Sequence, residues 1–211
     1  MKRSISILSA TLFFAAGLAN AQIPDPGTMV AKDAHNGVTI ACAPIIDATE
    51  SKARFGKKHP FDGGVLAVEL FVRNDNSEAV KIDVESIRLV VRSGGSRQRL
   101  RALRLDEVAH LVIYKDGSEP KTTRKRLPGP VQLPGNKKSK EVEKLEETLR
   151  PMALEMDVIP PRATVKGFLF FDMSGLFDIA RNAQLYIPDL SFTQSGKTLL
   201  YFEIELASAT K

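Results

Sequence analysis

The stretch VLAVELFVR, residues 65–73, decides the fold class, because its apolar residues recur at every second position. In an extended strand, successive side chains point to opposite faces. Leu66, Val68, Leu70 and Val72 therefore share one face of the predicted strand. The pattern is typical of a β-strand that packs against a hydrophobic core.

A turn and a second alternating run follow this strand. The turn is NDNS at 74–77, whose short polar side chains bond to nearby backbone. The second run covers 80–91, and its alternation slips by one residue at 85–86. We therefore predict a hairpin whose second strand contains a β-bulge at the slip.

Other alternating runs predict the remaining strands. They lie at 38–42, 154–158, 165–171, 185–190 and 199–206. Residues 165–171 are apolar on both faces, which predicts a central strand buried between two layers. In the last run, Leu200, Phe202, Ile204 and Leu206 should share one face.

The remaining segments predict loops and two helices. We expect an extended or mobile arm at 22–36 and a loop from 43 to 60. Asp106 is expected to cap a short helix that contains Val108, Leu111 and Val112. Ser139 is expected to cap a second helix, which buries Val142, Leu145 and Leu149 and stops at Pro151. The polar, basic residues 115–137 between these helices should be irregular or polyproline-like.

About seven short strands with turn-rich joints predict a mainly β fold, an antiparallel immunoglobulin-like sandwich. Its halves would be residues 37–92 and 151–211. A helix and loop insertion at 93–150 would separate them.

The C-terminal pattern resembles a known family. The residues that carry the resemblance are Val158-Ile159-Pro160-Pro161, Thr164 to Asp172 and Leu185 to Leu190. They are similar to the closing strands of exported bacterial immunoglobulin-like domains, of the immunoprotective-antigen and late-embryogenesis-abundant types. The resemblance implies a largely non-enzymatic domain, often without an assigned function.

The first 21 residues predict export. Lys2 and Arg3 precede an uncharged apolar run, and Ala19-Asn20-Ala21 forms a small-residue cleavage site. The alternative is a membrane anchor, but the apolar run is shorter than the roughly 20 residues that span a bilayer. We expect cleavage after Ala21, no transmembrane segment in the mature chain, and a periplasmic or secreted location.

Positive charge is concentrated in the middle of the chain. Residues 88–144 hold 15 Lys/Arg against 6 Asp/Glu, whereas the whole chain has a net charge of +5. Three basic clusters in this segment could attract an anionic lipid, a polysaccharide or another polyanion. They consist of Arg97, Arg99, Arg101 and Arg104; Lys121, Arg124, Lys125 and Arg126; and Lys137, Lys138 and Lys140. The alternative is a solvated surface with a flexible loop. Few aromatic residues lie among the clusters, which argues against nucleic acid.

No pattern for catalysis, metal or cofactor binding emerges. The three histidines are far apart, and Cys-x-x-Cys and His-Glu-x-x-His patterns are absent. The single cysteine, Cys42, alternates with Val38 and Ile40 and should point into the core as an inert thiol.

Three function hypotheses follow. The first is a non-catalytic exported module for binding or structure in the periplasm or envelope, with an unidentified protein or envelope component as partner. The second is a polyanion- or anionic-lipid-binding module that uses the basic insertion. The third is a hydrolase with its site in the insertion. A deep polar pocket of clustered titratable groups would count against the first.

Overall fold

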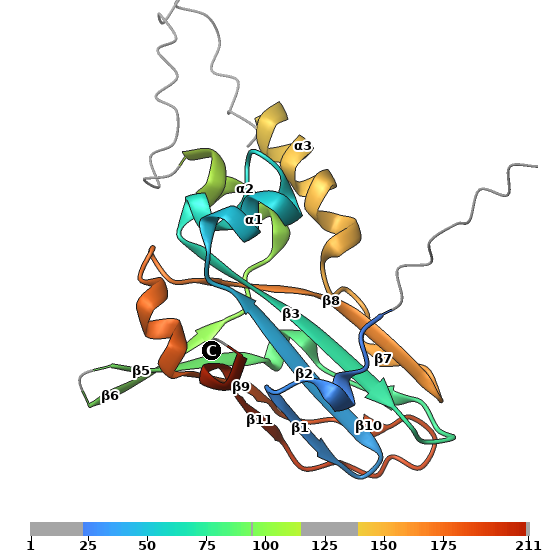
Figure 1. Cartoon of the computed structure of the whole chain (residues 1–211). Coiled ribbons are helices and arrows are strands. Elements are labelled where there is room, and N and C mark those ends of the chain that lie inside the picture. The colour runs from blue at the N-terminus through green and yellow to red at the C-terminus, as the bar shows by residue number, and fades with distance from the viewer. Residues whose placement is uncertain (1–22, 94, 115–138, 210–211) are drawn as a thin grey trace, which may run out of the picture.

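The computed structural model describes residues 23–93, 95–114 and 139–209. The predicted signal peptide and the basic segment 115–137 lie outside these ranges. The described part is mainly antiparallel β (Figure 1), with eleven strands in three sheets and three α-helices. The described strands outnumber the seven that the sequence pattern predicted, because β1, β6 and β10 were not predicted and the run 80–91 forms two strands.

The strand predicted at 65–73 lies inside the first sheet, whose strand order is β1-β2-β3-β8. Every neighbouring pair in it is antiparallel. The predictions of strands at 38–42, 65–73 and 165–171 are confirmed. The strands are β1 (Lys32–His35), β2 (Val38–Ile45), β3 (Val65–Asn74) and β8 (Ala163–Asp172).

Strand β8 lies at an edge of the first sheet, yet residues 167–171 are buried. Two other segments cover its outer edge. The Leu103 amide donates to the Phe170 carbonyl at 2.7 Å, and the Leu154 amide donates to the Phe168 carbonyl at 3.0 Å. These bonds satisfy backbone groups that an open edge would leave unpaired. Within the predicted run, residues 167–171 are buried, and their side chains enter the cores on both faces of the sheet. The predicted central position is wrong, because β8 is an edge strand.

The second sheet has the order β11-β9-β5-β6, and a small sheet has the order β10-β4-β7. The second sheet consists of β5 (Arg88–Ser93), β6 (Ser96–Arg101), β9 (Ala183–Ile187) and β11 (Phe202–Glu205). The small sheet consists of β4 (Val80–Lys81), β7 (Val158–Ile159) and β10 (Ser191–Phe192).

The predicted hairpin of 65–73 with 80–91 is wrong. Strand β3 pairs with β2 and β8, while β4 and β5 belong to two different sheets. In place of the predicted bulge, the 3₁₀ turn η3 (Val84–Ser86) carries the chain from one sheet to the next. Ile82 and Ile87 on either side of it are both fully buried. The slip in the alternation therefore marks a change of sheet.

Two hydrophobic cores lie on opposite faces of the first sheet. The larger core fills the space between the three sheets and contains the even-numbered residues of β3, Leu66 to Val72, with Leu89, Leu185 and Phe171. The smaller core lies between the other face and the helices, and it contains Val65, Ala67, Phe168 and Phe170. Cys42 belongs to the larger core and is fully buried, as predicted.

The three helices are α1 (Ala48–Phe55), α2 (Leu105–Tyr114) and α3 (Lys140–Leu149), and they cover one end of the first sheet (Figure 1). The Ser139 cap is confirmed, since its hydroxyl accepts from the Val142 amide at 3.3 Å. Helix α1 replaces part of the loop predicted at 43–60, and Asp47 caps it. Its buried residues are Ser51 and Phe55, so its sequence has no apolar stripe at helical spacing that would predict a helix.

The predicted cap at Asp106 is also wrong, because Asp106 lies within the first turn of α2. Glu107 instead reaches back and accepts from the Arg104 amide at 2.9 Å. This is one half of a capping box, in which the glutamate at the third helical position accepts a bond from the backbone amide of the residue just before the helix. Val108 and Val112 are buried, as the helical spacing predicted.

Three further boundaries differ from expectation. The arm predicted at 22–36 contains strand β1, which pairs with β2 through a turn at Asn36-Gly37. The run at 154–158 forms a strand only from Val158. Leu200 precedes β11 and is 71% exposed, whereas Phe202, Ile204 and Leu206 are buried. In the described ranges, no helix is long and apolar enough to cross a bilayer.

Candidate anion-binding face

The first residues of the predicted insertion at 93–150 belong to the second sheet, because β6 extends that sheet. Its partner is β5, and the two strands pair in register over their whole length. Arg101 lies opposite Arg88, Arg99 opposite Val90, and Arg97 opposite Arg92. Residues directly opposite in an antiparallel pair share a face. Five arginines therefore lie on one face of two adjacent strands.

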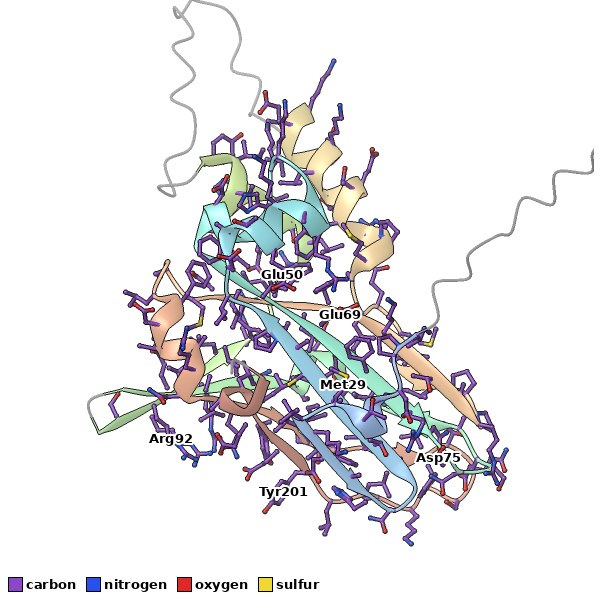
Figure 2. The ribbon with its side chains drawn as sticks, in the orientation of Figure 1. Met29, Glu50, Glu69, Asp75, Arg92 and Tyr201 are labelled. Carbon is purple, nitrogen blue, oxygen red and sulfur yellow. The ribbon has the colours of Figure 1, made fainter. Side chains whose placement is uncertain are left out.

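This face lies away from the larger core because the alternate residues point into that core. Of its own residues, Val90 is buried, Arg88 is half-buried, and the other four arginines are exposed. Leu89 and Val91 of β5 are buried in the larger core, and Leu100 of β6 packs against it. We call the opposite side the arginine face and define it by Arg88, Arg92, Arg97, Arg99 and Arg101. Figure 2 shows Arg92 and Tyr201 on the side of the second sheet that faces away from the first sheet.

The arginines at the far end of the hairpin have the fewest partners. Arg97 and Arg99 are exposed, and no carboxylate of the described residues lies within ion-pair distance of either. Arg92 is exposed and donates to the Gln184 side-chain oxygen at 3.3 Å. Within the described part of the chain, no carboxylate neutralises these three guanidinium groups.

Arg101 and Arg104 are already paired. Arg101 makes two bonds to Glu107, at 2.6 and 2.8 Å, and Arg104 makes two bonds to Asp106 at 3.2 Å. The bonds from Arg101 hold the pKa of Glu107 below its ordinary value and raise the pKa of Arg101. Both cations are therefore neutralised locally and contribute less to anion binding than the sequence suggested.

Replacing Glu107 by Gln tests this pairing through the pH dependence of stability. The pKa of Glu107 is lower in the folded protein than in the unfolded chain, so its ionised carboxylate stabilises the fold at pH values above the unfolded-state pKa. This stabilisation is lost as the pH falls through the folded-state pKa and the carboxylate is protonated. At neutral pH we expect the variant to lose about 0.5 kcal/mol of unfolding free energy, after allowance for water screening. The difference should shrink when urea unfolding is repeated well below pH 4.5, the ordinary pKa. A constant difference would contradict the assignment.

The other predicted anion-binding residues are not gathered on this face. Lys140 begins α3, at the opposite end of that helix from Arg150. The remaining members fall outside the described residues; they are Lys121, Arg124, Lys125, Arg126, Lys137 and Lys138. Conversely, sequence reasoning missed Arg88 and Arg92. The sequence shows that Arg88, Val90 and Arg92 alternate along one strand. Only the pairing of β5 with β6 shows that these residues share a face with Arg97 and Arg99.

A cleft of about 1060 Å³ opens at the end of the arginine face that carries Arg88 and Arg101. Its charges nearly balance. The cations are Lys81, Arg88, Arg101, Arg104 and Arg150, and the carboxylates are Asp83, Glu85, Asp106, Glu146, Glu155 and Asp157. Arg150 bridges Glu146 at 2.7 Å and Glu155 at 3.3 Å. The cleft is thus lined by internal ion pairs.

Four described groups that could take part in catalysis are Asp83, Cys42, His59 and Ser51. The Ser86 hydroxyl bonds Asp83 in the cleft and lowers the pKa of that carboxyl, which makes it a poor proton donor. Burial raises the pKa of Cys42 to about 12, so its thiol stays protonated. In the helical layer, His59 Nε2 lies 3.7 Å from Asp62. The buried Ser51 hydroxyl has no hydrogen-bond partner within the described ranges, so no relay joins it to His59.

Among the described residues, no group of three or more His, Cys, Asp or Glu side chains could hold a metal ion.

No protein-family model matches the chain, and no curated protein matches it in sequence. Among solved structures, it is similar to the crystal structure of a functionally unknown protein from Listeria monocytogenes EGD-e. The TM-score is 0.35 and the sequence identity 13%, over 80% of this chain and 78% of that chain. We take neither a fold family nor a function from this likeness.

Proposed function

We propose that the protein is an exported, non-catalytic binding module of the periplasm or cell envelope, and that the arginine face holds an anionic partner. Export rests on the signal-peptide pattern of residues 1–21. The binding role rests on one observation: Arg97 and Arg99 are exposed on one face of a paired strand without a carboxylate partner in the described part of the chain.

The charge arrangement supports binding rather than simple solvation. Cations of a solvated surface are usually interspersed with anions, as Arg104 and Asp106 are. On β5 and β6 the like charges instead lie opposite each other, with Arg97 opposite Arg92 and Arg101 opposite Arg88. Like charges directly opposite destabilise a sheet. A bound anion would relieve this repulsion and release the counterions that otherwise collect there.

The cleft beside Arg88 and Arg101 is where a hydrolase would most naturally place its site. It is polar and contains many titratable groups, which is the arrangement that would favour an enzyme. Two of its cations are, however, held by its own carboxylates: Arg104 pairs with Asp106, and Arg150 pairs with Glu146 and Glu155. We therefore favour a binding function over a catalytic one.

An immunoglobulin-like type of sandwich is part of the proposal. Its support is that antiparallel sheets share one core, which contains residues of β3, β5, β8 and β9. The added small sheet and the helical layer go beyond the compact domain that this family pattern describes.

Binding of heparin, a soluble polyanion, to the mature chain tests the proposal. We expect Arg97→Gln with Arg99→Gln to weaken binding about tenfold at low salt, because two unpaired guanidinium groups are lost. Vesicles with anionic lipid serve as a second probe.

The matched control is Lys52→Gln with Lys197→Gln, two exposed lysines on α1 and in the loop before β11. This variant loses the same net charge away from the arginine face, so its affinity should stay near that of the wild type. If both double variants lost affinity equally, binding would depend on net charge alone and the proposed face would be wrong.

A further inference from the structure

The outer edge of β6 is open. Strand β6 is the last strand of the second sheet, and β5 is its sole strand partner among the described residues. Side chains from Ser96 to Arg99 are exposed. The edge of β8 is treated differently, because the amides of Leu103 and Leu154 cover it. Among the described residues, two segments thus cover the edge of β8, and none adds a strand to the edge of β6.

The free edge is also displaced from the body of the sheet. Strand β9 pairs with β5 only from Arg88 to Val91, so the hairpin from Arg92 to Arg97 continues beyond it. Figure 1 shows β5 and β6 projecting from the body as a two-stranded ribbon. A second chain could therefore approach β6 from its open side without meeting the helices.

We propose that an acidic, extended segment of a partner protein binds as an added strand on the outer edge of β6. This inference rests on the proposed function and names the partner class for the same surface. Alternate residues of an edge strand present unpaired N–H and C=O groups outward, and an incoming strand pairs with them. β6 is six residues long, enough for a short ladder.

The side chains fix the chemistry of that strand. Arg97, Arg99 and Arg101 alternate along β6 and share one face. Side chains at every second position of an added strand would lie beside them on that face. Asp or Glu at those positions would meet Arg97 and Arg99, which have no carboxylate partner in the described part. Backbone bonds then supply affinity, and the alternating acids supply selectivity.

Charge excludes the two nearest alternatives from within the molecule. A second copy that paired β6 with β6 would bring arginines beside arginines, and like charges in adjacent strands repel. Residues 115–138 hold 7 Lys/Arg and 2 Asp/Glu, so this segment is basic as well. The occupant must therefore come from another, acidic chain.

The experiment measures fluorescence anisotropy of a labelled peptide, Thr-Glu-Val-Glu-Thr-Glu-Val, with the mature protein. Two analogues carry N-methyl groups on the backbone, one at the Glu residues and the other at the Thr and Val residues. In an added strand, alternate amides point toward β6 and away from it. We expect one analogue to bind about tenfold more weakly, through the loss of ladder bonds, and the other to bind like the parent.

The outcomes separate this inference from the proposed function. If both analogues bind like the parent while Arg97→Gln with Arg99→Gln weakens binding, strand addition is wrong and the arginine face stands. If that double variant affects neither peptide nor heparin binding, the proposed function itself fails. Strong binding to anionic vesicles without peptide binding would also overturn strand addition, in favour of a lipid surface.

Discussion

Replacing Phe171 by Ala is expected to lower the free energy of unfolding by about 3–5 kcal/mol. Phe171 is fully buried on β8, opposite Leu66 of β3, in the core between the sheets. Removal of the ring loses its transfer free energy and leaves a cavity that a packed β core closes only in part. The two sheets share this core, so the loss should affect the whole domain.

Urea unfolding of the mature chain measures the effect, with Phe177→Ala as the control. Phe177 is half-buried and stacks on Phe61 with ring centroids 3.9 Å apart. Its removal should cost about 1–2 kcal/mol, because less area returns to water. Equal losses at the two positions would contradict the assignment of Phe171 to the main core.

Replacing Gly167 by Ala is expected to destabilise the protein by about 1–3 kcal/mol, the range of overpacking. A Cβ atom at this position of β8 would lie 2.7 Å from both the amide nitrogen and the Cα atom of Leu154. These are backbone atoms, so the clash cannot be relieved by a change of side-chain rotamer. The Leu154 amide also bonds the Phe168 carbonyl, so the covering segment would have to give up that bond.

The sign of this effect makes it a sharp test. Where the backbone fits and space is free, Gly to Ala stabilises a protein by about 0.4–1 kcal/mol through the unfolded state. The control is Thr164→Ala, on the same strand but away from the crossing segment. A stabilised Gly167→Ala variant would show that Leu154 does not cross β8 as closely as described.

Much of the fold could be predicted because burial leaves period-two and helical patterns in the sequence. Strands β2, β3 and β8 follow from alternating or continuous apolar runs, and helix α3 follows from its cap and its apolar spacing. Pairing could not be predicted in the same way. The run at 80–91 shows that its residues are extended, but not that η3 divides them between two sheets.

The candidate site could be predicted in part for a similar reason. Residue type alone identifies Arg97 and Arg99 as cations, and their spacing predicts a shared face only if they form a strand. The contribution of Arg88 and Arg92 depends on the register with β6, which is a tertiary property. The pairing of Arg101 with Glu107 depends on the start of α2. Sequence therefore located the charge but not which cations are free.

The contrast between two sheet edges connects the fold to the proposed function. Natural sheets commonly cover or charge an exposed edge to prevent unwanted pairing. Here β8 is covered by backbone at Leu103 and Leu154, and β6 is charged. A charged edge excludes copies of itself and admits strands of opposite charge. Under the proposal, the same charged edge would prevent pairing between copies and would select an acidic strand.

The salt dependence of heparin binding tests the central claim most directly. For each chain, the logarithm of the association constant is plotted against the logarithm of salt concentration, and the slope reports the counterions released. We predict that Arg97→Gln with Arg99→Gln makes the slope shallower by about two, one for each lost cation. Lys52→Gln with Lys197→Gln should keep the wild-type slope. Identical slopes for the wild type and the Arg97/Arg99 variant would contradict the arginine face as the binding surface.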